Sequence, residues 1–315
     1  MILIRNFMNR MGKHNQMLIT FFIGAFSFSF LLFLALTSTI GHIPRIHHFV
    51  DPAMSVPLGQ HPSFHLRPAT LSDVSKIMSL VLPQVSHDGF HDYFFPHQDR
   101  YPQDFDSWWR RYYRDMILRP YTLVLVAEDS DRDMKGIAVW VYAPKVAGGG
   151  SGDNDDVPEP KGLNITKNSW YYVIRRHTYA WMDKIADKIQ PNRCIDRNAI
   201  QEWRQTVADM SKRLWTGEDR VHWYSFEFFT FGRSANGEEE KRTESHLVFH
   251  GNDEDKGDLA SLLLGWGIRQ SKLDNVSTFV LTLISLRELY EGVGYKAVDE
   301  IECGPSRCIA MKFIE

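Results

Sequence analysis

The sequence predicts an α/β fold, because strand patterns and helix patterns alternate along most of the chain. Residues 64–70 read as a first strand that ends at a proline, and residues 74–82 carry apolar side chains at helical spacing. The segment 123–142 holds two β-rich runs around a charged turn, which predicts a hairpin. Near the C-terminus, an apolar helix pattern at 259–268 precedes a buried strand at 278–283.

The composition is that of an ordinary globular protein. The chain has 315 residues, 43% of them apolar and 24% charged, so it can bury the core of one large domain or two small ones. The formal net charge of -3 and the lack of a Lys/Arg stripe argue against nucleic acid as a partner, because phosphate neutralisation needs clustered cations. The three cysteines have neither a disulfide-framework pattern nor zinc-site spacing (Cys194, Cys303 and Cys308).

The N-terminal residues predict a membrane anchor outside the folded domain. Residues 17–41 are almost wholly apolar and uncharged, which is long enough to cross a hydrocarbon core of about 30 Å. Cations lie in the preceding tail, residues 1–16, so the positive-inside rule predicts a cytosolic N-terminus. A cleaved signal peptide is one alternative, although its apolar core is normally only about 7–15 residues. A true start at Met54, within the linker 42–60, would instead leave a cytoplasmic protein.

Residues 146–222 form a distinct part of the predicted domain 61–315. Their Gly-rich stretch, 148–152, lacks the Gly-Lys-Ser/Thr ending of a phosphate-binding P-loop, so we interpret it as a flexible linker. Apolar residues then recur at helical spacing across 170–215, with a break at 190–192. This pattern predicts two helices inserted between the third and fourth strands.

The C-terminal motifs resemble those of the GNAT superfamily of acyl-CoA N-acyltransferases. A helix at 259–268, a buried strand at 278–283 and a short helix ending in Gly294-Tyr295 follow in the order found in that family. The resemblance extends from about residue 61 to the end. Within the family, the chain resembles a subgroup that carries a helical insertion between strands three and four. It implies a mixed, largely antiparallel sheet of about six to seven strands, splayed near strands four and five, with helices on both faces. It also implies acetyl-CoA, or another acyl-CoA, as co-substrate and an amine as acceptor.

The resemblance places the coenzyme A pyrophosphate at the start of the helix that contains Ala260. In the family pattern, Gln/Arg-x-x-Gly-x-Gly/Ala, glycines let the backbone approach the phosphates and free amides at the helix start bind them. This chain carries a degenerate version, whose implied binding residues are Lys256, Gly257, Asp258, Leu259, Ala260 and Ser261. Asp258 repels a pyrophosphate, whereas Lys256 attracts it. An acidic first turn that stabilises its own helix dipole explains the carboxylates equally well.

The resemblance and the residue types together indicate the catalytic groups. In the family a backbone amide of strand four stabilises the thioester oxygen, which here corresponds to the region from Phe229 to Phe231. Tyr290 matches the tyrosine that faces the cofactor sulfur and is the candidate acid, with a packing tyrosine as the alternative. Glu227 lies between two phenylalanines and is the candidate base, since desolvation would raise its pKa. Strand alternation could instead point Glu227 at solvent.

Two further segments allow more than one interpretation. The charged stretch Gly232–Glu244 separates strand four from the cofactor helix, and it is either a surface loop, an interruption of the strand or an artefact of the gene model. The aromatic stretch from Phe90 to Tyr113 is expected to line the acceptor site or to pack at the edge of the core. His87 and His91 have the spacing of a metal pair on a helix, but Asp88-Gly89 predicts a loop, so we expect no metal.

These patterns favour a single-pass membrane N-acetyltransferase that acts on a small-molecule or protein amine. The acceptor is not identified by them, because fold does not give function. The alternative is a catalytically silent, membrane-tethered binding or scaffold protein, with residues 146–222 as its partner surface. Acyl-CoA affinity distinguishes the two.

Overall fold

The computed structural model describes residues 63–86, 89–143, 160–161, 163, 167, 169–230 and 254–314. Within this part of the chain, a seven-stranded sheet has the order β1-β2-β3-β4-β5-β7-β6. Neighbouring strands are antiparallel except β4 and β5, which are parallel. The strands are β1 (His65–Pro68), β2 (Thr122–Glu128), β3 (Met134–Ala143), β4 (His222–Thr230), β5 (Ser277–Leu283), β6 (Tyr295–Cys303) and β7 (Ser306–Phe313). The predicted mixed, largely antiparallel sheet is confirmed.

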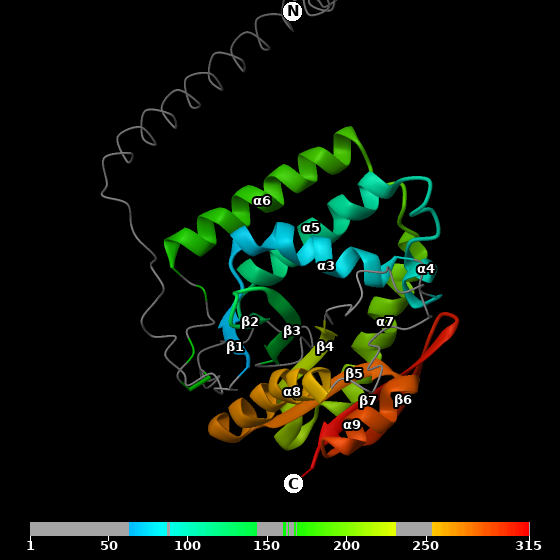
Figure 1. Ribbon diagram of the computed structural model, residues 1–315. Coiled ribbons are helices and arrows are strands. Elements are labelled where there is room, and N and C mark those ends of the chain that lie inside the picture. Colours follow the sequence, from blue (N-terminus) through cyan, green and yellow to red (C-terminus); the bar gives the residue numbers. More distant parts are fainter. Residues whose placement is uncertain are drawn as a thin grey trace, which may run out of the picture. The chain divides into compact units, whose positions relative to one another are not determined.

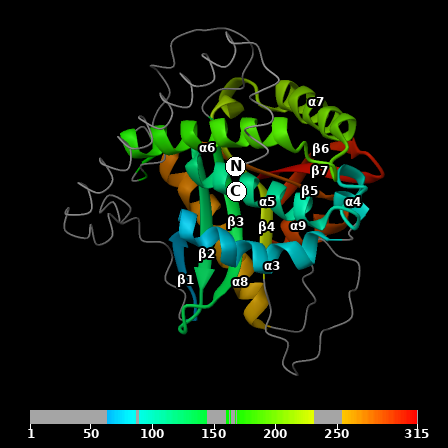
Figure 2. The same ribbon diagram turned by 90° about the horizontal axis from the view of Figure 1, so that it is seen from above.

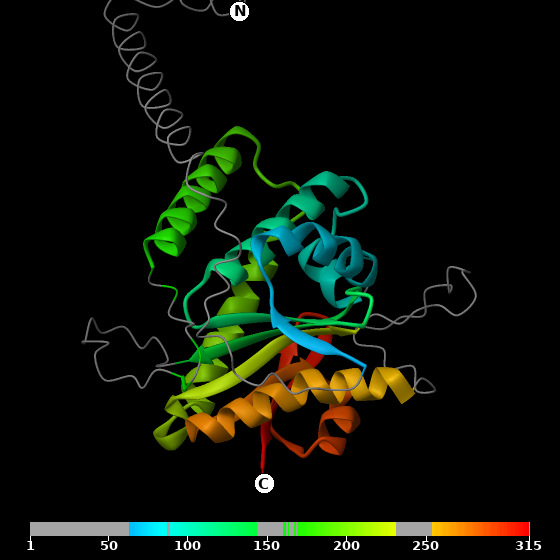
Figure 3. The same ribbon diagram turned by 60° about the vertical axis from the view of Figure 1, so that its left-hand side comes forward.

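Helices cover both faces of this sheet (Figure 1). Helices α3, α5 and α7 pack on one face, and α8 and α9 pack on the other, as Figure 3 shows with the sheet nearly edge-on. The helices are α3 (Val74–Val85), α4 (Gly89–Phe94), α5 (Pro102–Leu118), α6 (Trp170–Ile189), α7 (Arg197–Leu214), α8 (Glu254–Asp274) and α9 (Arg287–Gly292). Helix α6 packs on α5 and lies outside the layer that touches the sheet (Figure 2). The two helices predicted between the third and fourth strands are therefore present, as α6 and α7.

A single arginine ties the first strand to the sheet and to the first helix. Arg67 donates hydrogen bonds to both carboxylate oxygens of Asp73 at 2.8 Å and to Glu128 of β2 at 2.6 Å. Asp73 also accepts a hydrogen bond from the backbone N–H of Thr70 at 2.7 Å, within a capping box. The short stretch from Arg67 to Asp73 thus joins β1 to β2 and starts α3.

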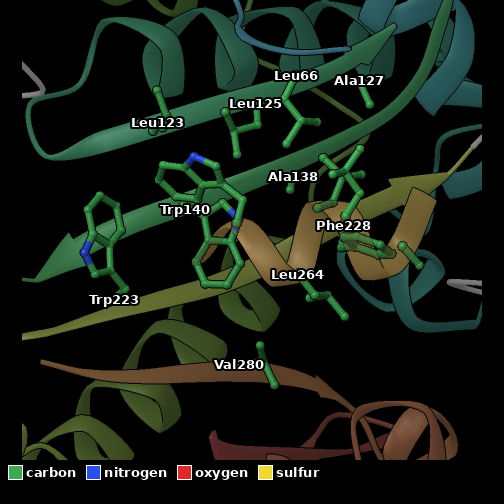
Figure 4. Packing of buried hydrophobic residues seen from close by; sticks show 14 of the residues in the cluster. Leu66, Leu123, Leu125, Ala127, Ala138, Trp140, Trp223, Phe228, Leu264 and Val280 are labelled. Atoms are coloured by element: carbon green, nitrogen blue, oxygen red, sulfur yellow. The ribbon is translucent and has the colours of Figure 1, made fainter. Parts of the chain in front are cut away.

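The core between the sheet and α8 is built on large aromatic side chains (Figure 4). Trp140 of β3 and Trp223 of β4 are fully buried, and their ring centroids lie 6.0 and 5.5 Å from that of Trp266 in α8. The indole N–H of Trp223 donates a hydrogen bond to Asp274 at 2.7 Å, so this buried polar atom is satisfied at the C-terminal end of α8. Helix α8 is thereby fixed against the middle of the sheet.

A β-bulge in β4 changes which side chains face each helical layer. The pairing of β3 with β4 skips Phe226, which is the extra residue of the bulge. Before the bulge, Trp223 packs in the cluster that contains α8, and beyond it Phe229 packs in the cluster that contains α5. Strict alternation would have placed Trp223, Glu227 and Phe229 on one face. The bulge therefore turns Glu227 toward α5.

Strands β4 and β5 separate immediately after the bulge begins. Their parallel pairing runs from His222 opposite Ser277 to Ser225 opposite Val280 and then ends. Both strands nevertheless continue, as far as Thr230 in β4 and three residues past Val280 in β5. A gap thus opens in the middle of the sheet, which confirms the expected splay near strands four and five.

The structure corrects three sequence-based expectations. The segment around His91, interpreted as a loop, contains the short helix α4. The helix expected at 259–268 begins earlier, at Glu254. Beyond Tyr295, strands β6 and β7 complete the sheet as a hairpin that the sequence patterns did not separate.

Several predicted segments lie outside the described residues. These are the apolar segment 17–41, the Gly-rich stretch 148–152 and the charged stretch Gly232–Glu244. None of the helices among the described residues has the length and apolar character needed to cross a membrane. Contacts divide the chain into Met1–Pro52 and Ala53–Glu315, and every described element belongs to the second unit.

Candidate functional site

A cavity of about 580 Å³ lies where β4 and β5 separate. This volume is typical of a site for a small molecule. The described lining includes Glu227 and Phe229 on the face toward α5, together with Val280 and Tyr290 from the cluster on the α8 side. The cavity therefore passes through the sheet at the gap between the two strands.

One wall of the cavity is aromatic and comes from three helices. Helices α4, α5 and α7 contribute side chains whose rings pack edge-to-face or stacked on one another. The aromatic stretch of the sequence thus reaches the cavity as well as the core. The aromatic residues of this wall are Phe90 and Phe94 of α4, Phe95 directly after it, Trp108, Trp109 and Tyr112 of α5, and Trp203 of α7.

Glu227 is the sole carboxylate among the described residues that line the cavity. Its Oε2 atom is buried and has no hydrogen-bond partner of good geometry in the described part of the chain, whereas the residue as a whole is only half-buried because it faces the cavity. Burial raises the pKa of Glu227 to about 7, and the hydroxyl groups of Tyr112 and Tyr113 act in the opposite direction. Such a carboxyl group can accept a proton near neutral pH.

Tyr290 reaches the same cavity from the short helix α9. Its side chain is buried, and its ring lies edge-to-face against Tyr295, with the centroids 5.8 Å apart. Burial raises the pKa of Tyr290 to about 12, and the neighbouring Thr282 hydroxyl acts in the opposite direction. The phenol therefore keeps its proton at neutral pH and can donate it. Gly294, with φ at +103°, completes the turn between this helix and β6.

The candidate cofactor-binding residues belong to two elements, β4 and α8. Phe229 is buried and lines the cavity, whereas Phe231 lies outside the described residues. Leu259 and Ala260 are buried in the core against the sheet, and Ser261 lies exposed on α8. Helix α8 begins at Glu254, so its first turn ends before Leu259, Ala260 and Ser261. The backbone amides of these three residues therefore bond within the helix and are not free to bind a ligand.

The free amides of α8 therefore belong to the turn that contains Lys256 and Gly257. Asp258 follows directly inside the helix. The helix expected at 259–268 thus starts earlier than the sequence pattern indicated, and Lys256 and Gly257 fall in its first turn.

Sequence reasoning did not identify the polar groups that surround Glu227. Tyr112 and Tyr113 are adjacent in α5, and both hydroxyl oxygens are buried. Burial raises the pKa of each tyrosine well above its usual value, with the Glu227 carboxylate as the next cause. In the sequence, Pro102 marks the start of this helix and Arg119-Pro120 marks its end. These two signals would have placed Tyr112 and Tyr113 on one helix.

Within the described ranges, no three His, Cys, Asp or Glu side chains are grouped so that they could hold a metal ion. His91 lines the cavity, and His87 is outside those ranges. Cys194 and Cys308 are buried free thiols.

Comparisons with known proteins gave structural likenesses only. No protein-family model matches the chain, and no curated protein matches its sequence. A Corynebacterium glutamicum structure described as histone acetyltransferase HPA2 and related acetyltransferase is 17% identical, covering 79% of this chain and 95% of its own, with a TM-score of 0.42. A putative GnaT-family acetyltransferase from Bordetella pertussis is 10% identical over 81% of this chain and 98% of its own, with a TM-score of 0.40. A chimera of the Vibrio cholerae spermidine N-acetyltransferase SpeG is 9% identical over 80% and 95% respectively, with a TM-score of 0.36. These proteins are what the chain resembles, and its own chemistry depends on the residues of its own cavity.

Proposed function

We propose that the chain is an N-acyltransferase that moves an acyl group, acetyl in the simplest case, from coenzyme A to an amine. One observation carries the proposal. A carboxyl group with a pKa near neutral and a protonated buried tyrosine line one cavity, at the point where two parallel strands separate. Acyl transfer to an amine needs a proton acceptor and benefits from a proton donor.

Glu227 is the proton acceptor in this proposal. When bound in the cavity, acyl-CoA supplies the acyl group as a thioester, whose C–S bond breaks as the new N–C bond forms. The attacking nitrogen gives up one proton, and Glu227 takes it at Oε2, the buried oxygen that has no hydrogen-bond partner of good geometry among the described residues. The raised pKa makes the carboxylate basic enough for this transfer near neutral pH.

Tyr290 and the backbone of β4 serve the other two requirements. Tyr290 is protonated at neutral pH and donates its proton to the leaving thiolate sulfur. Beyond Ser225, the described part of β4 pairs with β3 and no longer with β5, and this strand edge is the one that would face a developing oxyanion. Phe229, which lines the cavity, lies in the part of β4 that pairs with β3 but not with β5.

The cavity residues fit the acyl end of acyl-CoA better than the residues at the start of α8 fit its pyrophosphate. The gap between the described parts of β4 and β5 can admit an extended, amide-containing arm, much as an open strand edge does. At the start of α8, Lys256 and the free amides favour phosphate, while the neighbouring carboxylates oppose it. We therefore expect weak but specific acyl-CoA binding.

The full-length chain in detergent tests the proposal directly. Acetyl-CoA and a panel of primary amines should give thiol release that depends on the enzyme, and Glu227→Gln should lower it by about 10²–10⁴. The exposed Glu288→Gln change on α9 is the matched control and should leave turnover intact. A folded protein with no calorimetric signal for acetyl-CoA would overturn the proposal and leave the silent scaffold as the better explanation.

A further inference from the structure

We infer that the acceptor is a monoamine with an apolar or aromatic body rather than a polyamine, an inference that rests on the proposed function for its assignment of the site. The observation is the charge content of the cavity. Glu227 is the single carboxylate of the described lining, and the cations are Arg119 and Arg204. The rest of that lining is dominated by aromatic and aliphatic side chains.

A buried ammonium group needs a carboxylate partner. An unpaired cation loses its hydration when it is buried, so each charge of a bound amine requires its own partner or must stay in solvent. Glu227 can hold one ammonium group, and a second would meet no carboxylate among the described lining residues. Arg119 and Arg204 add positive charge, although Arg119 is paired with Asp115.

The body of the acceptor would contact the aromatic wall. Trp203 of α7 lies across from the α4 ring of Phe90, with centroids 6.0 Å apart, and Ile200 and Val207 extend the same wall along α7. Such a surface binds rings and alkyl chains through the apolar area that they remove from water. The site thus combines one charge-pairing group with an extended apolar contact, the arrangement that a phenylethylamine-like molecule fills.

Binding of 2-phenylethylamine and spermidine to the full-length chain, with and without coenzyme A, tests the inference by calorimetry. The monoamine should bind at least about tenfold more tightly than spermidine. Glu227→Gln should abolish most of that affinity, and Glu288→Gln should not. Val207→Asp adds a carboxylate to the wall and should shift the preference toward spermidine, with a melting curve to show that the variant is folded.

The outcomes separate this inference from the proposed function. Monoamine binding without any acetyl-CoA binding would support the inference and overturn the acyltransferase assignment. If acetyl-CoA binds and spermidine binds more tightly than the monoamine, the acyltransferase assignment is supported and the inference is overturned. Equal affinity of both amines, unchanged by Glu227→Gln, would overturn the inference as well.

A different observation, on helix α6, carries a second inference. We infer that the outer face of α6 lies on a membrane surface that contains anionic lipid. No residue of α6 is buried, and its large apolar side chains are unusually exposed, with Trp170 at 74%, Ile174 at 55% and Trp181 at 54%. Tyr171, Met182, Ile185 and Ile189 are exposed too. At about 100° per residue, all seven fall within an arc of roughly 120°.

The opposite face of α6 fixes the helix in this orientation. Asp183 pairs with Arg111 and Arg114 of α5, and Asp187 pairs with Arg111 at 2.5 Å. Arg114 also lies over the ring of Tyr179, 4.3 Å from its centroid. Both acidic residues of α6 are therefore held on the α5 side, and the apolar arc on the other side of the helix is exposed.

The edges of the arc carry the charge that an anionic bilayer attracts. Lys184 and Lys188 are exposed along one edge, and Arg175 lies along the other, over the ring of Tyr171. A helix with an apolar face, tryptophan and tyrosine on it and cations at its margins is the pattern of a helix lying in the membrane interface. A protein partner would be expected to meet carboxylates as well as cations on such a face. The apolar segment 17–41 of the same chain agrees with a membrane location.

Flotation with lipid vesicles tests this second inference. The chain from Met54 to Glu315, which contains every described element, should float with vesicles of 70% phosphatidylcholine and 30% phosphatidylserine and much less with phosphatidylcholine alone. Trp181→Ser with Ile185→Ser should lower the bound fraction at least about fivefold. Leu273→Ser, at an exposed apolar residue of α8, should not change it. If the protein with Trp181→Ser and Ile185→Ser floats as well as the wild type, the inference is overturned. A wild-type dimer in solution that these two changes dissociate would also overturn it.

Discussion

Gly267 of α8 lies directly against the indole of Trp140, so that a Cβ atom placed on Gly267 would be 2.1 Å from Cη2 of Trp140. Real Cβ atoms do not approach other atoms this closely, and Trp140 is fully buried at the centre of the sheet. The absence of a side chain at 267 is therefore what lets α8 sit on β3.

Gly267→Ala should destabilise the domain even though alanine is the better helix former. Overpacking a rigid, buried contact costs about 1–3 kcal/mol, more than the gain of about 1 kcal/mol in helix propensity. We expect the melting temperature to fall by several degrees. Gly292→Ala in α9 is the matched control, because a Cβ there meets nothing within 4 Å. A Gly267→Ala variant as stable as the wild type would show that α8 shifts easily.

The fold was predictable wherever local signals agreed with tertiary packing. The β1–α3 junction, the β2–β3 hairpin and the inserted helices α6 and α7 follow from caps, turns and apolar periodicity. The periodicity of α6 gave the correct helix, but most of its apolar residues turned out to be exposed, because a hydrophobic stripe does not specify what covers it.

Other elements depended on information that local patterns do not hold. The bulge at Phe226 depends on the register between β3 and β4, which no property of β4 alone specifies. The orientation of Glu227 follows from that bulge, so alternation could not decide between cavity and solvent. The aromatic helix α5 was missed because its ring-rich sequence has weak helix propensity, although Pro102 marks its start.

Tyr290→Phe removes one hydroxyl group and almost no volume. Because Tyr290 lines the cavity with its pKa raised to about 12, loss of its proton should lower turnover by about 10²–10⁴ while acyl-CoA affinity stays within a factor of about two. Steady-state and calorimetric measurements on both proteins check this. If the variant turns over like the wild type, Tyr290 is a packing residue and water protonates the leaving group.

Asp258→Asn should strengthen acetyl-CoA binding. Asp258 lies inside α8, one turn from its start, so asparagine removes the charge without the cost of placing glycine in a helix. The loss of one like charge near a pyrophosphate should lower the dissociation constant about threefold to tenfold at low salt. Glu288→Gln serves as the control for net charge. A dissociation constant that does not change, or that changes equally in the control, would place the phosphates away from α8.

Lys256→Gln should have the opposite effect and weaken acetyl-CoA binding several-fold. Lys256 is the cation within the first turn of α8, where a helix start attracts anions. The weakening should itself diminish as salt rises, since screening removes the contribution that Lys256 makes. Titrations at two ionic strengths measure it, and equal weakening at both would indicate a change in the fold instead.

The pH dependence of stability gives a test of Glu227 that needs no substrate. Burial raises its pKa to about 7 from 4.5, so the folded state binds a proton that the unfolded state releases between these values. The resulting stabilisation is complete below about pH 4.5 and is lost as the pH rises through 7. Glu227→Gln keeps the shape and removes the titration. Its melting temperature relative to the wild type should therefore increase between pH 5 and pH 8, by a few degrees, while its turnover falls. A constant difference across this range would mean that Glu227 is ionised and solvated in the folded protein, and that it is not the base poised near neutral pH.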